Sequence, residues 1–191
     1  MPRNPDQTRD RIIAAATRLF YGEGIRAVSV DAVAEKAGIT KKTLYYHFRS
    51  KDELITAYLE ARDQPTLALY ARWFAETEGP VHDKVRGLFL KFARSTNTPK
   101  WKGCGFLRTT AELANMPGHP ALKTGAMHKK RFEAWLTDAL TNEGVDDAPL
   151  IARKLIVLLD GAASVMLVHR DPAYVEAAGE VAASLIKRHI A

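Results

Sequence analysis

The stretch that most limits how this chain can fold runs from Ser29 to Leu54 and reads SVDAVAEKAGITKKTLYYHFRSKDEL. Ser29 and Thr40 are good helix N-caps, because their hydroxyl oxygens accept hydrogen bonds from N–H groups of the first turn. Gly38 separates two short apolar patterns, since glycine readily adopts the left-handed conformation that ends a helix. The stretch therefore predicts two short helices joined by one turn, a helix-turn-helix, and a capping box at Ser50 that opens a further helix.

The rest of the chain also reads as helical, because apolar residues recur with a 3.6-residue period and no run alternates as a strand would. Pro65 is expected to kink or break the fourth helix. The expected helices cover about 5–21, 30–37, 41–48, 51–78, 81–95, 104–115, 119–142, 147–169 and 172–190. We therefore predict an all-α fold of about nine helices. Residues 1–55 form the helix-turn-helix domain, and residues 56–191 form a second helical domain.

The basic residues are concentrated in the first quarter of the chain. Residues 1–51 contain ten Lys and Arg against five Asp and Glu, and the other 140 residues contain 18 against 17. The formal net charge of +6 therefore comes almost wholly from the N-terminal end. A localised excess of this kind indicates an anionic partner, either a nucleic acid or a membrane surface.

Several classes of protein are disfavoured by what the sequence lacks. The single Cys104 cannot form an intrachain disulfide, and MPRNPDQTRDR has no apolar core of a signal peptide. The longest apolar stretch, residues 155–168, is shorter than the roughly 20 residues of a membrane span. Neither a metal-ligand spacing nor a nucleophile motif is found. We expect a cytoplasmic protein with no cofactor, no metal and no membrane association. A small helical enzyme and a peripheral membrane protein are the alternatives.

The helix after Gly38 presents its basic face outward if its apolar residues point inward. Leu44 and Phe48, at positions i and i+4, form the inner face, so the residues between them and before them face outward or flank the seam. These are Lys41, Lys42, Thr43, Tyr45 and Tyr46. The start of such a helix is the part that reaches base edges in the major groove. The alternative is an ordinary solvated basic surface.

Residues 8–55 resemble the DNA-binding domain of the TetR family of transcriptional regulators, through LFYGEG, SVDAVAEKAGI and TLYYHF-x-SKDEL. The resemblance implies a homodimer that binds a palindromic operator in double-stranded DNA, usually as a repressor, and that is released by a small-molecule inducer. The inducer itself is unknown. Matched by position, the base-facing residues are Thr40, Lys41, Lys42, Thr43, Tyr45 and His47. The phosphate-contacting residues are Ser29, Tyr46 and Lys51.

The second domain offers candidate ligand-binding residues, although each has an alternative place in the core. They are Trp101, Cys104, Phe106, Phe132, Trp135, Asp160 and Met166. Cys104 is expected near a helix N-terminus and several basic residues, so it is either a reactive thiol or a small hydrophobic residue. Asp160 interrupts an apolar helix and needs a partner, which is a ligand, a second protomer or a structural ion pair.

The last two expected helices are the candidate dimer interface. Small residues from Gly161 to Val165 let another helix approach closely. One apolar stripe of the last helix contains Val175, Ala178, Ala182, Leu185 and Ile186. Such stripes would favour association if they were exposed in a monomer. In the resembling family these two helices pair with their copies in a four-helix bundle. An inducer in the second domain is then expected to oppose DNA binding by linkage.

Overall fold

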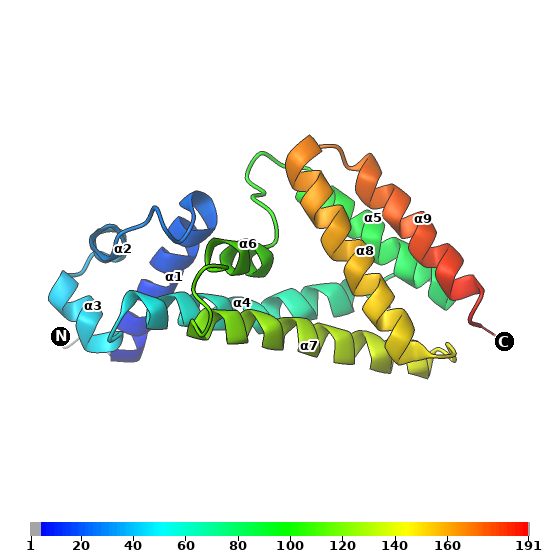
Figure 1. Cartoon of the computed structure of the whole chain (residues 1–191), viewed down its shortest axis with the longest axis horizontal. Coiled ribbons are helices and arrows are strands. Elements are labelled where there is room, and N and C mark those ends of the chain that lie inside the picture. Colours follow the sequence, from blue (N-terminus) through cyan, green and yellow to red (C-terminus); the bar gives the residue numbers. More distant parts are fainter. Residues whose placement is uncertain (1–4, 191) are drawn as a thin grey trace. The chain divides into compact units, whose positions relative to one another are not determined.

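The computed structural model describes residues 5–190, and its regular structure is helical apart from one isolated bridge between Val145 and Ile190 (Figure 1). This confirms the all-α prediction and its nine helices for the described part of the chain. Residues 1–4 and 191, which the expected domains include, lie outside the described residues. The helices are α1 (Pro5–Glu23), α2 (Val30–Ala37), α3 (Lys41–His47), α4 (Lys51–Ala75), α5 (Val81–Thr96), α6 (Gly105–Glu112), α7 (Pro120–Asn142), α8 (Ala148–His169) and α9 (Ala173–Lys187).

The predicted caps define the helix-turn-helix. The N–H of Ala32 donates to Ser29 Oγ at 3.1 Å, and the N–H of Thr43 donates to Thr40 Oγ1 at 3.1 Å. Gly38 ends α2 with φ of 63°, a conformation that costs a residue with a Cβ strain. The N–H groups of Gly38 and the next residue donate back to carbonyls of the last turn of α2. Local hydrogen bonds therefore determine where both helices begin and where the first one ends.

The fourth helix begins as predicted and continues through its proline. The N–H of Glu53 donates to Ser50 Oγ at 3.1 Å, and the carboxylate of Glu53 accepts from the N–H of Arg49 at 2.7 Å, which completes the capping box. A kink or a break was expected at Pro65, and the break is excluded, because α4 runs through the proline to Ala75, close to the predicted end near residue 78. Buried side chains on both sides of the proline, such as Leu59 and Trp73, hold the helix in place by tertiary packing.

The chain forms two compact units. The first contains residues 5–64 and 105–127, and the second contains residues 65–104 and 128–190. The chain passes between them within α4, after Gln64, and within α7, after Met127. This division differs from the expected boundary at residue 55, because α6 and the start of α7 pack with the N-terminal helices. The functional roles assigned to the two expected domains stay predictions.

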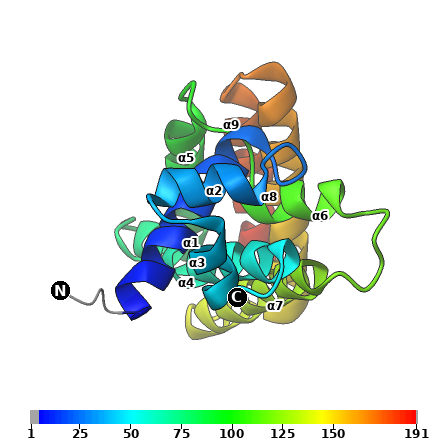
Figure 2. The ribbon, with the colours of Figure 1, turned by 90° about the vertical axis from the view of Figure 1, so that its left-hand side faces the viewer.

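In the first unit, the helix-turn-helix packs on α1 (Figure 2). Leu44 and Phe48 are completely buried, so the predicted inner face of α3 is confirmed. The guanidinium of Arg9 lies over the ring of Phe48, 5.0 Å from its centroid. Arg11 donates to the carbonyls of Ala37 and Gly38. Two basic residues of α1 therefore support α3 and the turn that precedes it.

The same unit contains two contacts of α6, one with the end of α1 and one with the turn after it, that the sequence did not predict. Arg108 in α6 donates to the carbonyl of Tyr21 at 2.8 Å, and Glu112 accepts from the N–H of Arg26 at 3.1 Å. Gly24, with φ of 95°, leaves space for the Glu112 carboxylate, which would lie 3.1 Å from an added Cβ. The turn between α1 and α2 is therefore held by a helix that lies more than 80 residues away in the sequence.

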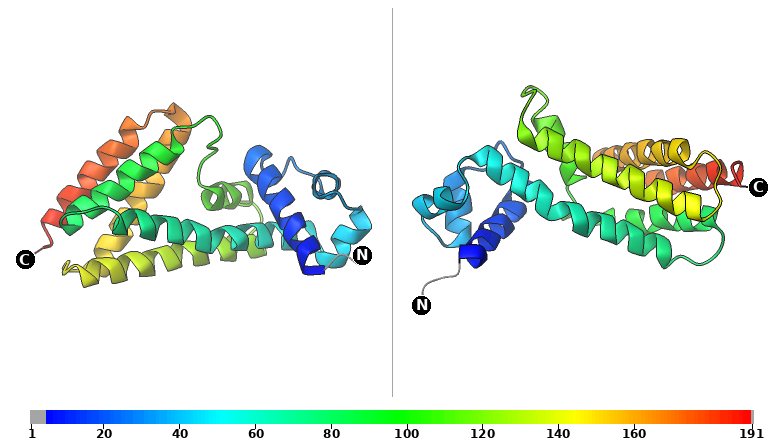
Figure 3. Two further views of the ribbon diagram at one scale, coloured as in Figure 1. Left: turned by 180° about the vertical axis from the view of Figure 1, so that it is seen from behind. Right: turned by 90° about the horizontal axis from the view of Figure 1, so that it is seen from below.

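The second unit is built around the packing of α5 and α8 with α9 (Figures 1 and 3). Its core also takes aromatic side chains from the second half of α4 and from α7. Three rings form a continuous stack: Tyr70 lies 4.8 Å from Phe132, and Phe132 lies 5.8 Å from Trp135, between ring centroids. Offset aromatic stacking contributes stability beyond the burial of apolar area.

The apolar stripe expected at the dimer interface is used inside the protomer instead. Val175, Ala182 and Ile186 are completely buried in the core of the second unit, and Ala178 and Leu185 pack against that core partly buried. That part of the sequence-based assignment is wrong, because α9 needs this face to pack on α5 and α8. The apolar residues that α8 and α9 do expose lie on other faces, and they include Val157, Val168 and Val181.

We expect Gly179→Val to destabilise the second unit, because α5 and α9 approach closely at this residue. A Cβ added at Gly179 would lie 2.8 Å from Cβ of the buried Phe89, closer than real contacts allow. Overpacking of this kind costs about 1–3 kcal/mol of unfolding free energy. Urea unfolding at a fixed protein concentration measures it. Gly22→Val is the control, since an added Cβ at Gly22 meets nothing within 4 Å and should change stability by less than about 0.5 kcal/mol.

Candidate nucleic-acid interface

The outer face of α3 is polar, cationic and exposed. Lys41 and Lys42 are exposed, and Tyr45 and Tyr46 are 44% and 80% exposed. Tyr46 is unusual, because large aromatic side chains are generally buried to a much greater extent. An exposed tyrosine offers a flat apolar ring and a hydroxyl that can donate to a phosphate oxygen.

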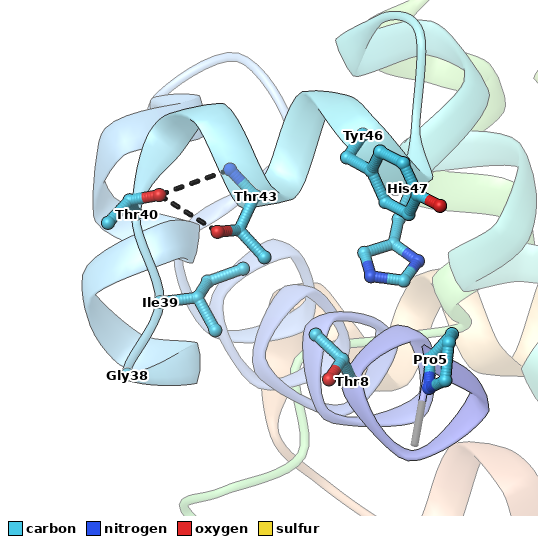
Figure 4. Close-up of a pocket in the computed structure, with 8 residues that line it drawn as sticks. All are labelled: Pro5, Thr8, Gly38, Ile39, Thr40, Thr43, Tyr46 and His47. Carbon is cyan, nitrogen blue, oxygen red and sulfur yellow. Dashed lines mark hydrogen bonds between the residues drawn. The ribbon is translucent and has the colours of Figure 1, made fainter. Parts of the chain in front are cut away.

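A surface hollow of about 660 Å³ lies beside this face (Figure 4). Thr40, Thr43, Tyr46 and His47 line it from the side of α3, and Pro5 and Thr8 line it from α1, with the turn at Gly38 and Ile39 completing the wall. The rings of Tyr46 and His47 meet edge to face, with centroids 5.2 Å apart. Four of the predicted interface residues therefore border a concavity and do not lie along one simple ridge.

Hydroxyl groups of the predicted interface take part in helix capping. Thr40 Oγ1 and Thr43 Oγ1 lie 2.9 Å apart, so one donates to the other, and Thr40 also caps α3. Ser29 Oγ accepts the N–H of Ala32 and keeps its own proton available to a phosphate oxygen. Capping thus holds these three side chains in defined positions at the surface.

The two lysines at the start of α3 differ in their surroundings. Lys41 Nζ lies 2.9 Å from Asp31 Oδ2, and this hydrogen bond raises the pKa of the Lys41 ammonium. Lys42 has no ion pair or side-chain hydrogen bond to another described residue. The prediction from sequence gives both lysines the same role and does not include the pair of Lys41 with Asp31. The sequence signal for this pair is the position of Asp31, an acidic residue in the first turn of the preceding helix.

Lys51 occupies the first position of α4, as predicted, but it is only partly exposed. Partial burial lowers the pKa of its ammonium, and the nearby carboxylates of Asp52 and Glu112 oppose this shift. The N-terminal end of α4 carries N–H groups that favour an anion, so a charged Lys51 adds to an existing positive potential.

The candidate ligand-binding residues do not gather in one place. Phe132 and Trp135 belong to the aromatic stack of the second unit. Trp101 packs edge to face on Phe92, with centroids 6.3 Å apart, and its carbonyl accepts from Arg170 at 2.7 Å. Met166 is buried and borders a separate surface hollow beside the loop at residues 96–99.

The remaining candidates have other surroundings. Asp160 pairs with the ammonium of Lys129 on α7. Of the three partners expected for Asp160, the structure therefore shows the structural ion pair. Phe106 is buried in the first unit, and Cys104 is a partly buried free thiol of the second unit. Their assignment to a ligand site stays a prediction.

The core of the second unit contains an apolar void that is almost filled. Its lining residues are Val85, Leu88, Phe89, Phe132, Leu136, Leu155 and Leu159. Its free volume is about 10 Å³, which is the space of a single water at most. A bound molecule of any size would therefore have to displace side chains of this core.

Residues 5–190 lack two further kinds of feature. Within this range no helix is long and apolar enough to cross a membrane. In the same range no three His, Cys, Asp or Glu side chains come together as metal ligands would.

Comparison with known sequences relates the helix-turn-helix, and at lower identity a larger part of the chain, to transcriptional regulators. Residues 12–58 match the family described as bacterial regulatory proteins, tetR family. The HTH-type transcriptional regulator SrpR of Pseudomonas putida is 40% identical over 60 residues, which are 31% of this chain and 28% of that protein. The chain therefore covers less than a third of SrpR. The HTH-type transcriptional repressor KstR2 of Mycolicibacterium smegmatis is 24% identical over 146 residues, or 76% of this chain and 69% of that protein.

Comparison with solved structures extends the likeness to the second unit. SCO4454, a TetR-family transcriptional regulator from Streptomyces coelicolor, has a TM-score of 0.81 and 30% sequence identity. The alignment covers 97% of this chain and 96% of that one. A TetR transcriptional regulator from Legionella pneumophila has a TM-score of 0.78 at 20% identity, which shows the shared fold. The likeness thus extends well beyond the helix-turn-helix.

Proposed function

Because the chain belongs to the TetR family of transcriptional regulators, which are not enzymes, we propose that it binds an operator in double-stranded DNA through α3 and represses transcription from it. The observation that supports this most directly is the exposed face of α3, where two lysines and two tyrosines surround a buried Leu44. A buried anchor with basic side chains at the helix start suits a helix that enters the major groove.

We assign the roles by position on this face. Lys41, Lys42 and Thr43 lie in the first turn of α3 and reach the base edges together with Thr40, Tyr45 and His47. Ser29, Tyr46 and Lys51 contact phosphates on either side. The hollow beside α3 gives the DNA backbone room to approach Tyr46, since that residue lines its edge. Phosphate contacts position the helix, and base contacts select the sequence.

We propose a homodimer formed by α8 and α9. Both helices expose valines, among them Val157 and Val181, with exposures of 67% and 55%. Large exposed apolar side chains on neighbouring helices favour burial against a second copy. A two-fold dimer presents two copies of α3 to half-sites about one helical turn apart, which explains why a palindromic operator is expected. Cytoplasmic location stays a prediction.

A small-molecule inducer is proposed to bind the second unit. Since the apolar void there has only about 10 Å³ of free space, the inducer must move core side chains to enter it. The stack of Tyr70, Phe132 and Trp135 lies on α4 and α7, the two helices that also continue into the first unit. A ligand that moves this stack therefore acts on helices shared with the DNA-binding unit, and DNA and inducer oppose each other by linkage.

Selection of the purified protein against random duplex DNA tests this function. We expect enrichment of a two-fold-symmetric site, and binding to that site that weakens steeply as salt rises, because phosphate contacts release counterions. A dimer that contacts six phosphates should lose roughly 10³-fold in affinity between about 50 and 200 mM salt. Binding without enrichment of any sequence would leave only a basic surface and would contradict the proposed function.

A further inference from the structure

The ion pair between Asp31 and Lys41 joins the two helices of the helix-turn-helix. Asp31 lies in the first turn of α2 and Lys41 in the first turn of α3, and the turn at Gly38 brings them together. Nζ and Oδ2 lie 2.9 Å apart, with side-chain exposures of 54% and 65%. Exposed pairs contribute little to folding. The effect of this pair should therefore be on what the surface binds.

Asp31 changes what Lys41 offers to DNA. A lysine ammonium has three N–H donors, and the carboxylate occupies one of them. The two that remain can serve guanine O6 and N7. The pair also restrains the flexible four-carbon stem of the lysine, so these donors keep one orientation. Lys42 beside it has no such restraint from any residue between 5 and 190.

The carboxylate also reduces the attraction of Lys41 to phosphates. A non-specific duplex offers the lysine phosphate charge in any register, and the negative Asp31 offsets that attraction. A guanine edge is a neutral acceptor, so the carboxylate penalises it less. We infer that Asp31 is a specificity-determining residue, which orients Lys41 towards a base and lowers the affinity of the protein for non-specific DNA. This inference rests on the proposed function.

The test compares Asp31→Asn with the unsubstituted protein on two duplexes of equal length, the selected site and a shuffled sequence. Fluorescence anisotropy over a salt series gives both affinities. For the shuffled duplex we expect an affinity gain of roughly two- to fivefold per recognition helix. The slope of log K against log salt should steepen by about one per helix. The selected site should gain less, so the ratio of specific to non-specific affinity falls.

Two controls separate the pair from the general effect of charge. Glu35→Gln makes the same charge change at an exposed residue of α2 that has no ion pair with Lys41, so it should shift both duplexes equally. Lys41→Gln removes the partner, and in this background Asp31→Asn should no longer change the ratio. Thermal melting of each variant checks that α2, which loses an acid near its N-terminus, still folds.

The outcomes are distinct. An equal gain on both duplexes, or an unchanged effect of Asp31→Asn in the Lys41→Gln background, would overturn the specificity role while leaving the regulator intact. A protein that enriches no site before any substitution is made would instead defeat the proposed function, and this inference with it.

Discussion

Replacing Lys42 with alanine is expected to weaken binding to the selected operator by roughly 5- to 100-fold, the range for loss of a base-contacting side chain. The reason is the position of this lysine in the first turn of α3, where it is exposed and unpaired within the described structure. Its ammonium is free to reach a guanine without breaking an existing contact. Competition binding with operators changed at one base pair at a time measures the effect.

The pattern across these operators identifies the role of Lys42. If it reads a base, Lys42→Ala relaxes the preference at one position of each half-site and lowers non-specific affinity less. If it holds a phosphate, all duplexes lose affinity alike and the salt slope falls by about one per helix. Lys123→Ala is the matched control, because it removes an exposed lysine from α7 in the same unit, outside the helix-turn-helix. A loss of operator affinity for Lys123→Ala that equals the loss for Lys42→Ala would contradict the assignment.

Phe132→Ala is expected to lower the free energy of unfolding by about 3–5 kcal/mol, as other truncations of buried phenylalanines do. Phe132 is 2% exposed and lies at the centre of the stack between Tyr70 and Trp135. Its removal deletes both stacking contacts and enlarges the void that it lines. Because tight packing lets neighbours relax only partly, the cavity adds to the lost transfer energy.

Urea unfolding followed by helical circular dichroism measures this loss, at one protein concentration because a dimer's stability depends on it. Phe132→Leu is the conservative control and should cost less than about 1.5 kcal/mol, since it keeps most of the volume. Operator binding at low temperature should survive both changes, because Phe132 lies outside the unit that contains α3. A loss below about 1 kcal/mol for alanine would show that the stack is not a principal part of the core.

The helix-turn-helix was predictable because its signals are local. Ser29, Thr40 and Ser50 each cap the helix that follows them, and Gly38 adopts the left-handed conformation expected of it. A cap needs only a side chain and an N–H two or three residues away, so its effect is contained in a short sequence. The inward direction of Leu44 followed equally from helical periodicity.

Predictions that depended on distant partners were less successful. Val175 was assigned to a dimer interface although it is buried inside the protomer. Periodicity shows which face of a helix is apolar, but it does not show which helix covers that face. The ligand candidates share this difficulty, since aromatic residues that fill a core have the same pattern as those that line a pocket.

The sequence by itself determined the helix-turn-helix, its caps and the outward direction of its basic residues, because neighbouring residues settle them. Only the tertiary structure paired Asp31 with Lys41, placed Glu112 against the turn after α1 and closed the core of the second unit around Phe132. Asp31 and Lys41 are 10 positions apart in the chain, and Glu112 and its partner Arg26 are 86 positions apart. Their geometry depends on how separate helices pack, and helix packing is decided by all the side chains at once.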